Sequence, residues 1–329
     1  MLRIADTFVV ENPTTIEEAL SLLAHHGAGA RLVAGGTDLL PNIKHGLHAP
    51  EVLVSLKRVA ALRALDLDGE VLTLGALLGI HEIAQSAEIG AALPALRQAC
   101  GQIAGPQLRR MGTLGGNVCL DTRCVYINQS AFWRGALGYC LKKDGDDCHV
   151  TVVGKKCVAA ASNDTAPVLI ALGASAQLIG PRGERSVRLD DFYVNDGTHN
   201  NVLAHDEILT ALRVPRSATT RRQSFQKLRV RDAIDFPLLN LCLAFDLDGD
   251  GAVRDAVLVV GAVAARPRRV KNLPAGRPDA DLIDEAAEQA YRQVRPLTNI
   301  DADVAWRRDM VRTLVRRAFA DALGRAEAE

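Results

Sequence analysis

Apolar and polar positions along the first hundred residues follow two different periods, which predict helices and strands in turn. A helix is expected after Thr14 and Thr15, because either threonine can cap it, a Glu follows three residues later, and Gly27 can end it. Further strands are expected at 31–34, 51–56 and 71–75, and further helices at 81–85 and 91–100. This mixture is typical of an α/β unit.

The same mixture continues to about residue 215, where Pro215 and a polar run indicate a domain boundary. Beyond it, two apolar runs flank Asp248–Gly251, which has the composition of a hairpin turn, and two helical patterns follow. The expected elements are a helix at 164–173, strands at 176–180, 207–214, 238–247 and 256–265, and helices at 281–293 and 301–326. We therefore predict an α+β fold, with one domain at 1–218 and a second domain of antiparallel sheet and helices at 219–329.

Residues 120–158 sustain neither period and carry four of the seven cysteines. A segment this long without regular structure is uncommon in a compact domain and usually functional. The four are Cys124, Cys140, Cys148 and Cys157. They lack the CxxC pairs of zinc ribbons and fingers, and four thiolates on one irregular loop suit a [4Fe–4S] cluster. From the residues alone, an iron–sulfur cluster, zinc and uncoordinated thiols all stay open.

The other three cysteines have simpler interpretations. Cys100 and Cys242 lie in apolar runs and are expected to be buried core thiols, and Cys119 is expected to be no ligand. The 39 Lys and Arg balance the 39 Asp and Glu, so neither a nucleic acid nor a membrane is an expected partner. With no apolar run of about 20 residues and no leader pattern, we expect a cytoplasmic protein with reduced thiols.

Two glycine-bearing segments, 34–38 and 112–117, each follow an apolar run. Adjacent glycines let backbone N–H groups approach an anion, and threonine hydroxyls can add hydrogen bonds to phosphate oxygens. Either segment alone is more often a tight turn, but the pair fits a ligand that carries a pyrophosphate. A Rossmann site is not expected, because Gly27–Leu32 is an incomplete GxGxxG motif and lies before a predicted strand, whereas the dinucleotide-binding motif follows one. A P-loop is not expected either, because GxxxxGK[ST] does not occur.

The two segments, in this order, resemble the FAD-binding medium subunits of the xanthine oxidase family of molybdenum hydroxylases. Phe8 with Asn12-Pro13, Leu74-Gly75-Ala76 and the segment from Lys227 to Asp235 extend the resemblance over nearly the whole chain. It implies a two-subdomain FAD-binding fold followed by the carboxy-terminal domain. The implied FAD-binding residues are Leu32, Val33, Ala34, Gly35, Gly36, Thr37, Asp38, Leu39, Gly112, Thr113, Gly115, Gly116, Asn117, Asp164, Leu209 and Lys227. Among them, Asp164 and Lys227 would lie near the isoalloxazine ring, although Asp164 could also simply cap the helix that follows it.

An insertion at about 122–161 separates the second glycine segment from Ser162–Pro167, where the family pattern resumes. With its four cysteines, this insertion resembles that of the β subunits of 4-hydroxybenzoyl-CoA reductases. The resemblance implies a [4Fe–4S] cluster on Cys124, Cys140, Cys148 and Cys157. Ferredoxin would supply electrons, which would pass through the cluster and FAD to a small [2Fe–2S] subunit and a large molybdenum subunit, two copies of each.

The implied reaction is the reductive dehydroxylation of 4-hydroxybenzoyl-CoA to benzoyl-CoA, and its catalytic residues would lie on a partner chain. Two alternatives remain open. The chain would be the FAD subunit of a carbon monoxide, xanthine or nicotinate hydroxylase if it bound flavin without iron. A zinc-stabilised binding module without flavin is the other alternative.

Overall fold

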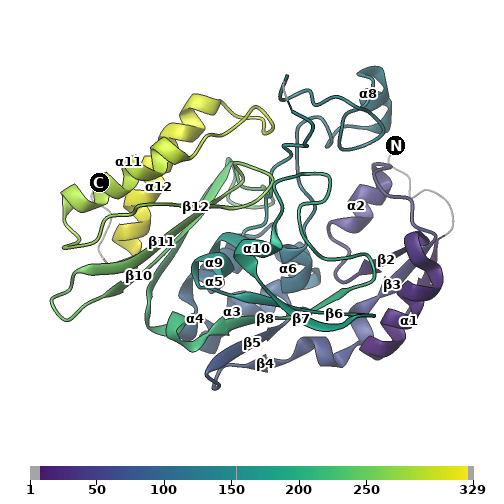
Figure 1. Cartoon of the computed structure of the whole chain (residues 1–329), viewed down its shortest axis with the longest axis horizontal. Helices are drawn as coiled ribbons and strands as arrows, with labels where there is room; N and C mark the ends of the chain where they lie inside the picture. Colours follow the sequence, from purple (N-terminus) through teal and green to yellow (C-terminus); the bar gives the residue numbers. More distant parts are fainter. Residues whose placement is uncertain (1–7, 153, 325–329) are drawn as a thin grey trace.

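The computed structural model describes residues 8–152 and 154–324, which form three sheets with helices around them (Figure 1). The first sheet is parallel, in the order β1-β3-β2, and α1 packs on it through Ala19 and Leu23. Its elements are β1 (Val9–Glu11), α1 (Ile16–His26), β2 (Ala30–Val33), α2 (Leu39–Lys44) and β3 (Val52–Ser55). As expected, Thr15 caps α1 by accepting from Glu18 N–H at 3.1 Å, and Gly27 ends the helix with φ 51°.

The second sheet is antiparallel, in the order β4-β5-β8-β6-β7, and it packs against the helices that carry the second glycine segment. Its strands are β4 (Leu65–Asp66), β5 (Val71–Gly75), β6 (Ser175–Gly180), β7 (Gly183–Arg188) and β8 (Ile208–Pro215). Its helices are α3 (Ile80–Gln85), α4 (Ala87–Ala92), α5 (Pro94–Gln102), α6 (Pro106–Met111), α7 (Leu114–Val118), α9 (Thr165–Ala171) and α10 (Leu189–Phe192). Short 3-10 helices lie at Gly27–Gly29, Leu56–Arg58, Ala60–Arg63 and Arg216–Thr220.

The third sheet, in the order β12-β11-β10-β9, is buried on both faces. Alternate residues of β10 face opposite cores: Leu241 and Leu243 pack with α11 and α12, whereas Cys242 and Ala244 belong to the core around the second sheet. Figure 1 shows α11 and α12, in yellow, across one face of this sheet. The elements are β9 (Arg222–Leu228), β10 (Leu239–Leu247), β11 (Val253–Gly261), β12 (Arg268–Val270), α11 (Ala280–Gln293) and α12 (Val304–Ala322).

The cysteine-bearing insertion is almost entirely irregular, as expected, with one short helix, α8 (Ala131–Ala136), in its described residues. It projects beyond the sheets (Figure 1). A small apolar cluster that includes Leu47 and Ile127 anchors it to the body of the protein. Of the described helices, none combines the length and the hydropathy that a bilayer span requires.

The structure departs from the expected elements at a few places. The single helix expected at 91–100 is two helices, because Pro94 cannot donate to the preceding turn and instead starts α5 at its first position. Strand β7 was not expected, since its side chains are mostly exposed and lack apolar alternation. The second glycine segment was expected as a loop, but it runs into helix α7. Beyond residue 324, the end expected for the last helix lies outside the described residues.

Arg307 on α12 generates a prediction about stability, because this fully buried side chain donates to three backbone carbonyls, those of Leu238, Ala262 and Leu297. Burial lowers the pKa of Arg307 to about 10. We expect Arg307→Met to lower the free energy of unfolding by at least about 3 kcal/mol, since it leaves three buried carbonyl oxygens without a hydrogen-bond donor. Arg316→Met, on the same helix but in an exposed ion pair with Asp284, should cost less than about 1 kcal/mol. Urea unfolding measures both, and equal costs would contradict this account.

Candidate functional site

A cavity of about 600 Å³ lies among the first two sheets, helices α6 and α7 and the segment 234–236. Its volume is in the range of pockets that hold small-molecule cofactors. Every residue that the sequence assigns to FAD lines this cavity except Lys227. The structure thus brings together two glycine segments that are about 75 residues apart in the sequence.

The first glycine segment turns sharply between β2 and α2. Gly36 has φ +69°, a backbone conformation that favours glycine. Among the hydrogen bonds of the described residues, none has the backbone N–H of Gly35, Gly36 or Thr37 as its donor. Consecutive N–H groups in such a turn form a concave site for an anion.

The second segment forms the start of α7, where the Thr113 hydroxyl caps the helix by accepting from Gly116 N–H at 3.2 Å. Its glycines allow close packing. A Cβ on Gly115 would lie 2.7 Å from the Cβ of Ala76, and a Cβ on Gly35 would lie 1.9 Å from the carbonyl oxygen of Met111. The two glycine segments are therefore in contact at Gly35, where a side chain would separate them, whereas Gly115 lets α7 pack closely against Ala76.

Asp164 lines the cavity, whereas Lys227 lies behind it. The Lys227 ammonium is 2.7 Å from Asp164 Oδ2, and the Asn240 amide donates to Oδ1 at 2.8 Å. Both charged side chains are buried, with exposed fractions of 1% for Lys227 and 5% for Asp164. Burial raises the pKa of Asp164, although the positive charge of Lys227 opposes the change. Asp164 occupies the N-cap position of α9, but its side chain makes no capping hydrogen bond. Its side chain therefore does not act as a simple helix cap.

A polar network that the sequence did not reveal closes the cavity on the side of the insertion. Arg123 pairs with Asp38 and donates to Asn42 at 3.3 Å, and its guanidinium lies 4.9 Å from the ring centroid of Phe236. His48 Nε2 lies 3.5 Å from Asp121 Oδ2. Burial acts to raise the pKa of Asp121, but His48 and Lys142 outweigh it and hold this pKa below its ordinary value.

Apart from Asp38, which belongs to the first glycine segment, these network residues follow no motif, and only the fold brings them together. Other lining segments missed from the sequence are 201–207 and the apolar positions Ile234 and Phe236. The resemblance did point to this part of the chain, since the segment from Lys227 to Asp235 contains Ile234 and ends just before Phe236.

The four insertion cysteines line a second, much smaller cavity, together with Ile127 and Lys142. Cys124 and Cys157 are buried, and Cys140 and Cys148 are partly exposed. Among the described residues, no three His, Cys, Asp or Glu side chains converge closely enough to hold a single metal ion. The four thiols are instead spread around one small cavity.

Hydrogen-bond donors face several of these sulfur atoms. Burial acts to raise the pKa of Cys148, but the Thr151 hydroxyl and backbone N–H groups including that of Val150 outweigh it and lower this pKa. Burial raises the pKa of Cys157 to about 11, and the N–H of Ala159, 3.4 Å from its sulfur, opposes the change. Such N–H···S contacts stabilise thiolates and tune iron–sulfur centres.

The remaining cysteines lie elsewhere. Cys100 and Cys242 are fully buried in the core, as expected, and burial raises the pKa of both thiols. Cys119 lines the large cavity rather than the small one, and burial raises its pKa to about 12.

Comparison with known proteins places this geometry in a family. Residues 6–217 match the model of the FAD binding domain in molybdopterin dehydrogenase, and residues 223–322 match that of the CO dehydrogenase flavoprotein C-terminal domain. The chain is an FAD-binding medium subunit of the molybdenum hydroxylase family.

The medium subunit is similar over its whole length to characterised relatives. It is 26% identical to the carbon monoxide dehydrogenase medium chain of Hydrogenophaga pseudoflava, over 97% of this chain and 98% of that one. It is 24% identical to the nicotinate dehydrogenase FAD-subunit of Eubacterium barkeri, over 96% of each. A solved structure of the Hydrogenophaga pseudoflava carbon monoxide dehydrogenase superposes with a TM-score of 0.80 at 25% identity, over 99% of this chain and 100% of that chain.

The contact between the glycine segments generates a prediction about flavin binding. We expect Gly35→Ala to lose most of its bound FAD, because the new Cβ collides with the Met111 backbone and forces the segments apart. Gly101→Ala is the matched control, since a Cβ there meets nothing within 4 Å. The flavin-to-protein ratio after purification measures the effect. Full flavin occupancy in Gly35→Ala would show that the contact does not shape the binding site.

Proposed function

We propose that the medium subunit holds FAD in the large cavity and a [4Fe–4S] cluster in the cysteine cavity, as the electron-transfer subunit of a 4-hydroxybenzoyl-CoA reductase. The proposed cluster, and with it the assignment to this reductase, rests on one observation: all four cysteines of the insertion line one cavity. These residues are up to 33 positions apart in an irregular segment, and a shared ligand would require their thiols to gather in this way.

The large cavity fits FAD through its own groups. The unbonded N–H groups of Gly35, Gly36 and Thr37 suit the pyrophosphate, and Asn117 holds α7 against α9 by accepting from the Thr165 hydroxyl at 2.6 Å. FAD, when bound, supplies the ability to exchange one or two electrons. Asp164 is the charged side chain nearest Lys227 on this wall, so we propose that Lys227 acts on the flavin by holding Asp164 ionised and oriented.

The cysteine cavity fits a cluster by its donor set. In a [4Fe–4S] cluster each iron takes one thiolate, so four thiols around one cavity match the requirement. The N–H groups that face Cys124, Cys148 and Cys157 compensate the negative charge that four thiolates bring. A Cβ on Gly197 would lie 2.8 Å from Cys157 Sγ, so this glycine leaves the sulfur room to face the cavity.

The proposed assembly follows from the relatives, which are medium chains and FAD subunits of larger enzymes. We propose a cytoplasmic complex with a large molybdenum subunit and a small [2Fe–2S] subunit, two copies of each, and ferredoxin as the electron donor. Two electrons and two protons remove the phenolic hydroxyl of 4-hydroxybenzoyl-CoA as water and leave benzoyl-CoA. The residues of this chain bind and position redox groups, and the substrate binds elsewhere.

A second candidate is the FAD subunit of a hydroxylase that acts on carbon monoxide, xanthine or nicotinate. The names of the relatives favour it, since they include carbon monoxide, nicotinate and xanthine dehydrogenases. The cysteine cavity has no role in this alternative.

Substitution of one cysteine tests the cluster. We expect Cys140→Ser to lose most iron and acid-labile sulfide and to keep FAD, because the two cavities are lined by different segments. Cys119→Ser, outside the small cavity, should keep its iron and sulfide. Full iron and sulfide in Cys140→Ser would show that the ligand assignment is wrong.

Activity of the purified complex separates the two candidate functions. With reduced ferredoxin, the wild-type complex is expected to convert 4-hydroxybenzoyl-CoA to benzoyl-CoA, and the complex carrying Cys140→Ser is expected to lose most of this ferredoxin-dependent rate. A wild-type complex that instead oxidised carbon monoxide, xanthine or nicotinate, with no reductase activity, would favour the second candidate.

A further inference from the structure

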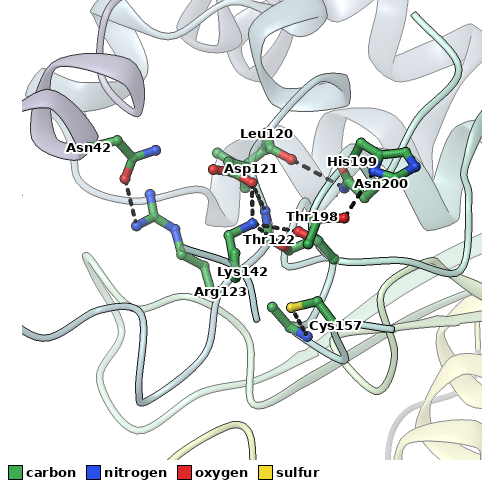
Figure 2. Close-up of polar contacts among 12 residues, drawn as sticks. Asn42, Leu120, Asp121, Thr122, Arg123, Lys142, Cys157, Thr198, His199 and Asn200 are labelled. Atoms are coloured by element: carbon green, nitrogen blue, oxygen red, sulfur yellow. Dashed lines mark hydrogen bonds and ion pairs between the residues drawn. The ribbon is translucent and has the colours of Figure 1, made fainter. Parts of the chain in front are cut away.

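Lys142 lies between the two cavities and is almost inaccessible, with 8% of its side chain exposed. Its ammonium is 2.6 Å from each of three oxygens: Asp121 Oδ1, the Thr122 hydroxyl and the Gly197 carbonyl (Figure 2). The three acceptors satisfy all three ammonium hydrogens. One of them is the carboxylate of Asp121, which is partly exposed, so the nearly buried ammonium forms an ion pair at the base of the insertion.

This ion pair is oriented. Lys142 lines the cysteine cavity, whereas Asp121 lines the large cavity. The positively charged residue of the pair therefore lies on the side of the cysteines, and the negatively charged residue lies on the side of the large cavity. Lys143, the next residue, is partly exposed, pairs with Asp144 and is not part of either cavity wall.

Several chain segments meet at the base of the insertion, and some of them are joined without Lys142. Thr122 already donates to the Gly197 carbonyl at 2.7 Å, and Gly197 N–H donates to the Cys157 carbonyl at 2.8 Å. Residues 122, 157 and 197 are thus joined without Lys142, which in addition ties its own segment to Asp121, Thr122 and Gly197. What the lysine adds is a charge in a region shielded from water, where charges act strongly and are weakly screened by salt.

We propose that Lys142 raises the reduction potential of the cluster in the cysteine cavity, with Asp121 as the partner that holds its ammonium in place and partly offsets its charge. The inference rests on the proposed function, because it requires the cluster. Reduction adds one electron to a centre that already carries four thiolates, and a nearby buried cation stabilises the added negative charge. The electron comes from the one-electron donor, and no bond is made or broken.

Redox titration of the purified complex, followed by the electron paramagnetic resonance signal of the reduced cluster, tests this role. At the wild-type midpoint potential, Lys142→Met is expected to lower the ratio of reduced to oxidised cluster about tenfold, which corresponds to a shift of about 59 mV for one electron. Lys142→Arg keeps the charge and should stay within about twofold of the wild type. Lys143→Met, the matched control, should also stay within about twofold.

Asp121→Asn keeps the test decisive if Lys142→Met fails to assemble its cluster. It removes the offsetting negative charge, so the ratio of reduced to oxidised cluster should rise severalfold, opposite to the effect of Lys142→Met. A merely structural role predicts no such reversal of sign. An unchanged or lowered ratio in Asp121→Asn, or an unchanged ratio in Lys142→Met, would overturn the inference while leaving the proposed function intact.

Iron and sulfide analysis of the wild-type complex distinguishes the two kinds of failure. A wild-type protein without a cluster would overturn the proposed function and this inference together. A wild-type protein with a cluster, and variants without the expected shifts, would overturn the role of Lys142 alone.

Discussion

The contact between the two glycine segments is the constraint on which the large cavity depends. Gly35 lies so close to the Met111 carbonyl that a single added carbon would be 1.9 Å from its oxygen. This contact joins the parallel sheet, through the turn after β2, to the helices that pack on the antiparallel sheet. The cavity lies where the two units meet, so its walls come from segments far apart in the sequence.

The insertion adds a second site without disturbing the first. It leaves the body after α7, returns before α9, and gathers its cysteines around a cavity of its own. One ion pair joins the two cavity walls at the base of the insertion: Lys142, which lines the cysteine cavity, pairs with Asp121, which lines the large cavity. This pair places opposite charges on the walls of the two cavities.

Much of this arrangement could be predicted from the sequence, because the features that carry it are local. The strand before Gly35, the helix capped by Thr15 and the hairpin at Asp248–Gly251 all have short-range signals, and each occurs in the structure. The clustering of cysteines in an irregular segment predicted a shared site, and in the structure all four line one cavity.

Features that depend on long-range packing were missed. No local signal connects Arg123 to Asp38, which is 85 residues away, or Lys142 to Gly197, which is 55 residues away. The separation of Lys227 from the large cavity by Asp164 is also a property of the fold, because both residues matched the family pattern and only their packing decides which one faces the cavity.

Iron, acid-labile sulfide, zinc and flavin analysis of anaerobically purified protein tests the central claim that one chain carries two separate redox sites. The account predicts four iron, four sulfide and one FAD per chain, with no stoichiometric zinc. One FAD with no iron after cluster reconstitution would contradict it and leave the cysteine cavity without its proposed ligand.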